Sequence, residues 1–185
     1  MRLIVGLGNP GRRYERTRHN LGYAVLVELA RRLKPGAPKS KFHGEVVEAS
    51  LEGEKVLLLS PVTYMNQSGR SVQAARDFYG LPNEQLLAIC DDMNLPLGKL
   101  RCRPGGASGG QKGLEDVIRM LGTEEFPRLR IGIGQAPEGW DAADFVLARF
   151  TQEELPEIED AVSRAADAVA LWVREGIGPC MSRYN

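Results

Sequence analysis

The segment that most constrains the fold lies near the amino terminus, where an apolar strand runs into a glycine turn. Leu3–Val5 fits a buried strand, and Gly6–Gly11 contains three glycines, an asparagine and a proline. Polar residues then continue to His19 and Asn20, where an amphipathic helix begins. A buried strand, a loop and a helix in this order are typical of an open α/β sheet, which binds ligands beyond the carboxyl ends of its strands. Functional residues are therefore expected at this edge.

The same turn matches the dinucleotide-binding pattern G-x-G-x-x-G at Gly6, Gly8 and Gly11. In that motif the helix begins inside the pattern, so that its amino end meets the pyrophosphate. Here about eight polar residues separate the turn from the first helical periodicity. The motif also needs an acidic residue after a second strand, whereas Glu28 falls in the middle of the expected helix. A nucleotide-dependent oxidoreductase is therefore disfavoured.

Composition bounds the class of protein. At 185 residues the chain is long enough to bury its own core, and we expect one domain over residues 1–185. No stretch approaches the roughly 18 apolar residues of a membrane span, and no signal peptide is visible. Cys90, Cys102 and Cys180 lack C-x-x-C spacing, and the chain has only two histidines. We therefore expect a cytoplasmic protein that uses no metal and no other cofactor.

The zero net charge conceals two oppositely charged segments. Residues 1–39 carry nine Lys or Arg against Glu15 and Glu28, whereas residues 138–175 carry ten Asp or Glu against three Arg. A chain divided in this way can present a basic face to a polyanion and stay soluble. Two ordinary solvated faces give the same composition, so charge alone leaves both interpretations open.

Hydrophobic periodicity predicts strands and helices in mixed order. The expected strands are Arg2–Val5, Gly44–Ser50, Lys55–Leu59, Leu86–Cys90 and Leu129–Ile133, and the expected helices are Asn20–Leu33, Ser68–Tyr79 and Leu114–Leu121. A longer helix follows the capping box of Thr151 and Glu154 and ends at Gly176. Phe145–Phe150 fits a further strand or an irregular stretch. This order predicts an α/β fold with a mixed, twisted β-sheet flanked by helices.

Two side chains at the expected element ends suit general-base chemistry. His19 precedes a helix, where the positive end of the helix dipole favours the neutral, basic form of an imidazole. Asp91 follows the buried strand Leu86–Cys90, and a carboxylate bonded to a histidine fixes its tautomer and stabilises the imidazolium. Asp92 is expected on the other side of the extended chain. For each residue alone, a structural histidine or a turn aspartate explains the pattern at least as well.

Asn66 and Tyr64 lie between an expected strand and the helix Ser68–Tyr79. The amide of Asn66 could cap that helix, or it could bind a substrate carbonyl or a water molecule. Tyr64 could stack on a base or a ribose, or it could pack against the protein. Both alternatives stay open for both residues.

A row of cations precedes a glycine-rich segment. Alternation sends Lys99, Arg101 and Arg103 to one face of an extended stretch, and residues 104–113 follow with five glycines. Cations beside exposed backbone N–H groups suit a phosphate backbone. The segment is not a Walker loop, because Gly113 follows Lys112 where that motif requires Ser or Thr.

Several of these segments occur in an order that is typical of one family. They are Gly6–Gly11, Tyr14, Thr17–Asn20, Thr63–Gly69 and Asp91–Gly98. In these segments the chain closely resembles the bacterial peptidyl-tRNA hydrolases, and the likeness runs from Leu3 to about Gly134. The resemblance implies a monomeric, metal-independent esterase with a mixed sheet between helices. Such an enzyme releases peptides from peptidyl-tRNA that has left the ribosome, so tRNA is the expected partner.

The resemblance also implies roles for the matching residues. His19 is implied as the catalytic base and Asp91 as its carboxylate partner, while Asn9 helps to distinguish a blocked α-amine from a free one. Asn66 is implied to hold the water or the peptide main chain. The residues implied to contact tRNA are Tyr14 and Tyr64 at the acceptor end and Arg101, Arg103 and Arg130 at its phosphates.

One position departs from the family's pattern. The family usually reads Gly-Gly-His-Asn-Gly where this chain has Gly109–Gly113 with Gln111 and Lys112 in the middle. The asparagine amide expected at position 112 is therefore absent, and a lysine offers charge but no acceptor. We expect Lys112 to meet a phosphate near the acceptor terminus.

Two functions from different classes fit this sequence. In the first, neutral His19, oriented by Asp91, takes a proton from a water that attacks the ester between the peptide and the 3′-terminal ribose. In the second, a non-catalytic relative binds RNA with the same basic face. The presence of His19 and Asp91 together with Asn9 and Asn66 favours the enzyme, because binding alone needs no base with a carboxylate partner.

Overall fold

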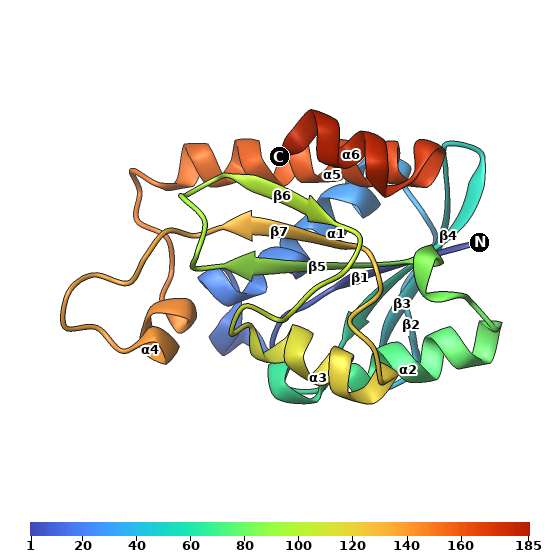
Figure 1. The fold of residues 1–185 in the computed structure, drawn as a ribbon, viewed down its shortest axis with the longest axis horizontal. Helices are drawn as coiled ribbons and strands as arrows, with labels where there is room; N and C mark the ends of the chain where they lie inside the picture. The colour runs from blue at the N-terminus through green and yellow to red at the C-terminus, as the bar shows by residue number, and fades with distance from the viewer.

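The computed structural model describes residues 1–185, and all of its strands join one seven-stranded sheet (Figure 1). The strands are β1 Arg2–Gly6, β2 Lys39–Lys41, β3 Gly44–Leu51, β4 Glu54–Pro61, β5 Leu86–Asp92, β6 Leu100–Arg103 and β7 Arg128–Gly132. Their order across the sheet is β2-β3-β4-β1-β5-β7-β6. The neighbours β4, β1, β5 and β7 are parallel, whereas β2–β3, β3–β4 and β6–β7 pair antiparallel. The predicted α/β class with a mixed sheet is confirmed.

Helices cover both faces of this sheet (Figure 1). They are α1 Leu21–Leu33, α2 Ser68–Tyr79, α3 Lys112–Leu121, α4 Ala142–Leu147, α5 Leu155–Glu175 and α6 Ile177–Tyr184. Side chains alternate along β1, so that Ile4 packs with α1 and α5 while Leu3 and Val5 pack with α2 and α3. The sheet therefore has a separate apolar core on each face. None of the six helices is both long enough and apolar enough to cross a bilayer.

Most expected elements are present with closely matching ends. The helix Ser68–Tyr79 has the predicted bounds and ends at Gly80 in the left-handed conformation, with φ 59°. The predicted capping box also forms: Thr151 N donates to Glu154 Oε2 at 2.8 Å, and Glu154 N donates to Thr151 Oγ1 at 3.3 Å. Strong local signals therefore fixed these boundaries.

The expectation for Phe145–Phe150 is wrong in its first half. Residues up to Leu147 belong to the short helix α4, whose Asp141 cap accepts a hydrogen bond from Ala143 N at 2.8 Å. Only Arg149 pairs in a strand-like way, through one isolated bridge to Thr17. The strand β2 and the helix α6 were not expected from the sequence.

The two oppositely charged segments partly neutralise each other. Arg18 forms a two-pronged ion pair with Glu154, with N–O distances of 3.0 and 2.8 Å, and Arg32 pairs with Asp167 at 2.6 Å. Part of the local charge excess is therefore neutralised by ion pairs within the chain. The exposed cations of the loop after β1, which form no ion pair, are Arg12, Arg13 and Arg16.

The Arg18–Glu154 pair predicts a pH-dependent stability. Partial burial acts to raise the pKa of Glu154, but the hydrogen bonds from Arg18 and Thr151 outweigh it and lower the pKa below its ordinary value. The pair therefore stabilises the fold above the pKa of an unfolded glutamate, about 4.3. This contribution is lost as the pH falls through the lowered value.

We expect Glu154→Gln to lower the thermal unfolding temperature at pH 7 and to lower it progressively less as the pH approaches 3. Glutamine serves the capping box as well as glutamate does, so the substitution removes the charge and keeps the cap. Unfolding followed by circular dichroism checks this. An equal loss at both ends of the pH range would contradict the ion-pair account.

Candidate active site

Polar side chains gather around a cleft of about 770 Å³ at the carboxyl edge of the sheet. The parallel strands β1, β4 and β5 end at this edge, so the loops that follow them meet. It is the edge toward which the arrows of β5 and β7 point in Figure 1, with α4 beside it. The lining comes from the turn after β1, the short turn before α1, the loop after β4, the end of β5, residues 109–112 and α4 with its cap.

His19 and Asp91 meet in this cleft although 72 positions separate them in the chain. His19 lies in the short 3₁₀ turn Arg18–Asn20 before α1, and its Nδ1 is 2.9 Å from both carboxylate oxygens of Asp91. The two side chains are only 10% and 3% exposed. An ionised carboxylate only accepts hydrogen bonds, so in the neutral ring Nδ1 carries the proton. Nε2 is then free to accept a proton from a molecule in the cleft.

The side chain of Asn9 is held so that its amide nitrogen stays available to a ligand. Its Oδ1 accepts a hydrogen bond from Met65 N at 2.7 Å, which leaves Nδ2 for a ligand. Asn20 fixes the backbone of Asn9, accepting from its N–H and donating to its carbonyl, both at 2.9 Å. Sequence reasoning missed Asn20. The available signal was a second amide directly after His19 at a helix start.

Asn66 and Tyr64 both line the cleft. Asn66 lies in the 3₁₀ turn Met65–Gln67 and is exposed, and its side-chain amide forms no hydrogen bond within the chain. Its alternative role as a helix cap is wrong, because Gln67 is the N-cap residue of α2 and no side chain caps that helix. Tyr64 is 60% exposed, so its ring is accessible to a ligand.

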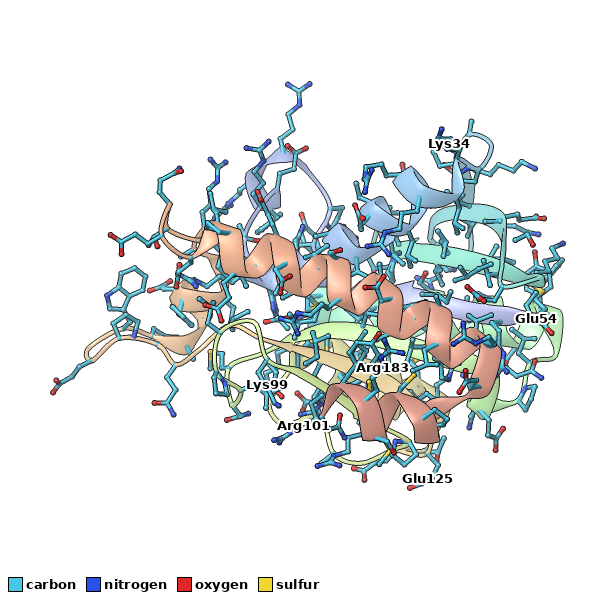
Figure 2. All side chains as sticks on the ribbon, turned by 90° about the horizontal axis from the view of Figure 1, so that it is seen from above. Lys34, Glu54, Lys99, Arg101, Glu125 and Arg183 are labelled. Carbon is cyan, nitrogen blue, oxygen red and sulfur yellow. The ribbon has the colours of Figure 1, made fainter.

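Of the other residues expected to contact tRNA, Lys112 lines the cleft, whereas Tyr14, Arg101, Arg103 and Arg130 lie outside its lining. Arg101 and Arg103 alternate with buried neighbours on β6, the edge strand, as the pattern predicted. Figure 2 shows Lys99 and Arg101 near each other, on the same side of α5 as Arg183. Tyr14 is half-buried in the turn after β1. Contacts of these residues with tRNA stay predictions.

The guanidinium of Arg130 is largely paired with groups of the same chain. Its guanidinium pairs with Asp92 at 3.2 Å and donates to the carbonyl of Ala107 at 2.5 Å, and its side chain is only 14% exposed. Asp92 also lines the cleft, and its carboxylate accepts a hydrogen bond from Asn94 N at 2.8 Å. Arg130 thus braces the glycine-rich loop, and its contact with a phosphate stays a prediction.

Gln111 is the clearest residue that sequence reasoning missed. Its Nε2 donates to Asp91 Oδ1 at 3.1 Å, and its Oε1 accepts from Leu114 N at 2.7 Å as the cap of α3. This cap lets the helix begin at Lys112, earlier than the expected Leu114. Glutamine is not among the favoured capping residues, so the sequence carried no signal for it.

The cleft offers few groups that could act as a covalent nucleophile. No serine, threonine or cysteine lines it. Burial, with a smaller effect of the neighbouring Asp91, raises the pKa of Cys90 to about 12, so that thiol stays protonated. No three His, Cys, Asp or Glu side chains lie together as a metal site would need. The arrangement that the cleft does show is an imidazole hydrogen-bonded to a carboxylate.

Known proteins resemble this chain in sequence and in fold along its whole length. The family model of peptidyl-tRNA hydrolase matches residues 3–185. The peptidyl-tRNA hydrolase of Rhodopirellula baltica is 52% identical over 100% of this chain and 97% of that protein, and that of Desulfitobacterium hafniense is 48% identical over 100% of both. The crystal structure of peptidyl-tRNA hydrolase from Acinetobacter baumannii has a TM-score of 0.93 and 36% identity, over 100% of this chain and 94% of that one. The chain belongs to the peptidyl-tRNA hydrolase family.

Proposed function

We propose that this chain hydrolyses the ester between the peptide and the 3′-terminal ribose of peptidyl-tRNA, with His19 as the general base. Family membership over residues 3–185 supports the substrate. The observation that carries the mechanism is the 2.9 Å hydrogen bond between His19 Nδ1 and Asp91 in the cleft. The enzyme recycles peptidyl-tRNA released from ribosomes. We place it in the cytoplasm, as a monomer of one domain that needs no metal.

The proposed reaction moves one proton through His19. Nε2 takes a proton from water as the water oxygen attacks the ester carbonyl, and Asp91 stabilises the imidazolium that forms. The imidazolium then returns the proton to the departing ribose oxygen. A base of this kind supplies about 10²–10⁴-fold in rate. An ester needs less activation than an amide, so the proposal requires no covalent nucleophile.

The two asparagines of the cleft give a basis for choosing the substrate. The free Nδ2 of Asn9 is a donor, and an N-blocked aminoacyl group offers it a carbonyl oxygen. The ammonium group of an aminoacyl-tRNA is itself only a donor, so it gains nothing from Nδ2. Asn66, with its amide unpaired, holds the water or the peptide main chain.

The test is incubation with N-acetyl-aminoacyl-tRNA and, in parallel, with the same tRNA carrying a free amino acid. We expect release of the acetylated amino acid and little release of the free one. Chromatography of the released products measures both. A chain that binds both tRNAs and releases nothing would instead be the non-catalytic RNA-binding protein.

Lys112 provides a further prediction about the acceptor end. Its Nζ pairs with Glu115 at 2.9 Å, but Lys112 is 67% exposed at the cleft and such surface pairs contribute only about 0–1 kcal/mol. A phosphate can therefore replace Glu115. We expect Lys112→Asn to reduce the slope of log K against log salt for tRNA binding by about one unit, because one phosphate contact is lost.

The control for Lys112→Asn is Lys34→Asn. Lys34 is the exposed cap at the end of α1, in the left-handed conformation that asparagine tolerates, and it lies far from α4 (Figure 2). The substitution Lys34→Asn should therefore leave the salt slope of tRNA binding unchanged. The same slope for both variants would count against a phosphate contact of Lys112.

A further inference from the structure

Asp91 receives hydrogen bonds from two sides. His19 Nδ1 contacts it from the turn before α1, and Gln111 Nε2 contacts its Oδ1 at 3.1 Å from the start of α3. Gln111 is only 8% exposed, and its Nε2 also lies 3.4 Å from the sulfur of Met65. Gln111 lines the cleft, but both polar atoms of its amide are paired within the chain, with Asp91 and with the first turn of α3.

The orientation of the Gln111 amide follows from its partners. Leu114 N–H can only donate, so the atom 2.7 Å from it must be the amide oxygen. The amide nitrogen then faces Asp91, where only a donor can bind an ionised carboxylate. Each partner thus enforces the same orientation. The amide cannot flip without losing both hydrogen bonds at once.

We propose that Gln111 is a positioning residue, which holds the carboxylate of Asp91 in the rotation that presents both oxygens to His19. The inference rests on the proposed function and deepens it. The last torsion of an aspartate is broad and soft, so a carboxylate bound by the histidine alone can rotate. A hydrogen bond from the capped end of α3 fixes this torsion. The base is then aligned before substrate binds, as preorganised catalysis requires.

The chemistry of an amide suits this position. Gln111 stabilises the anion of Asp91 but carries no charge that would oppose the imidazolium forming on His19. Histidine, which the resemblance places here, can gain a proton or change tautomer, whereas glutamine does neither. In this chain the support of Asp91 is therefore independent of pH.

Two substitutions separate this role from capping. In Gln111→Ser the hydroxyl caps α3, because serine is a strong N-cap, but it is too short to reach Asp91 as well. In Gln111→Glu one oxygen keeps the cap while the other places a like charge against Asp91. The stability control is Thr151→Ala, which weakens the cap of α5 away from the cleft.

We expect Gln111→Ser to unfold like the wild type and to lose between about 10-fold and 100-fold in kcat with KM little changed. Gln111→Glu should lose more, and the acid limb of its pH–rate profile should move to higher pH, because a second carboxylate favours the imidazolium. The other charged groups around the cleft are the Asp92–Arg130 and Lys112–Glu115 pairs, each internally neutralised, and Asp141, which caps α4; all are the same in every variant. Thr151→Ala should lose stability and keep its kcat.

Proton NMR of the His19 Nδ1–H, without substrate, provides a readout besides activity. We expect a downfield signal protected from solvent exchange in the wild type, with faster exchange in Gln111→Ser. If both Gln111 variants keep the kcat, the pH profile and the exchange rate of the wild type, Gln111 serves only as a helix cap and the inference is wrong. Faster exchange in Gln111→Ser than in the wild type, together with a wild-type protein that hydrolyses no N-acetyl-aminoacyl-tRNA, would keep the positioning role and reject the proposed function.

Discussion

Replacing His19 with alanine is expected to abolish practical turnover while tRNA binding survives. The substitution removes the only imidazole in the cleft, and with it a base that contributes about 10²–10⁴-fold to the rate. It leaves the cations outside the cleft, including Arg101 and Arg103, in place. Single-turnover hydrolysis of N-acetyl-aminoacyl-tRNA measures the first effect, and a direct binding titration measures the second.

The matched control uses the only other histidine. His43 is exposed, lies outside the cleft and has a positive φ of 54°, which asparagine tolerates. His43→Asn should therefore hydrolyse substrate at the wild-type rate. Substantial residual hydrolysis by His19→Ala, or an equal loss in His43→Asn, would overturn the assignment of the base.

Replacing Asp91 with asparagine is expected to cause the second largest loss, in kcat rather than in KM. The amide fills the same volume, but its nitrogen can donate to Nδ1 of His19 and thereby favour the tautomer protonated at Nε2. That tautomer cannot take a proton from water at the cleft. The lost carboxylate also no longer stabilises the imidazolium. We expect a decrease of about 10²–10⁴-fold in kcat by steady-state kinetics.

Asp92 is the natural control for this substitution because it is the next residue on β5. Its carboxylate serves Arg130 and Asn94 N rather than the histidine. Asp92→Asn keeps an acceptor for Asn94 N and loses the ion pair, so its main effect should be on thermal stability. A larger kcat loss for Asp92→Asn than for Asp91→Asn would mean that Asp91 is not the functional partner of His19.

The sequence predicted best those elements whose ends carry strong local signals. The capping box before α5 and the glycines after α2 and α5 place their boundaries without reference to the rest of the chain. The helix α4 shows what local patterns miss. It has six residues, and its Phe145 is buried under the guanidinium of Arg18, 4.4 Å from the ring centroid. That contact joins segments far apart in sequence, so periodicity within α4 could not reveal it.

The site was predictable to the extent that its residues end strands. His19 follows β1 and Asp91 lies at the carboxyl end of β5, so both were expected at the carboxyl edge of a sheet. Their contact depends on β1 and β5 being neighbours, which the structure shows and the sequence alone could not. The pairing of Arg130 with Asp92 likewise comes from the adjacency of β5 and β7. Gln111 could not be predicted, because glutamine is an uncommon N-cap residue and gives no capping signal in the sequence.

The most direct test of the account is a double-mutant cycle on His19→Ala and Asp91→Asn, with kcat/KM measured for all four proteins. Because Asp91 is proposed to act only through the imidazole, Asp91→Asn should cost nothing further once His19 is alanine. The pair should then be about as active as His19→Ala alone. If Asp91→Asn reduces kcat/KM by the same factor with and without His19, the two groups act independently and the proposed mechanism is wrong.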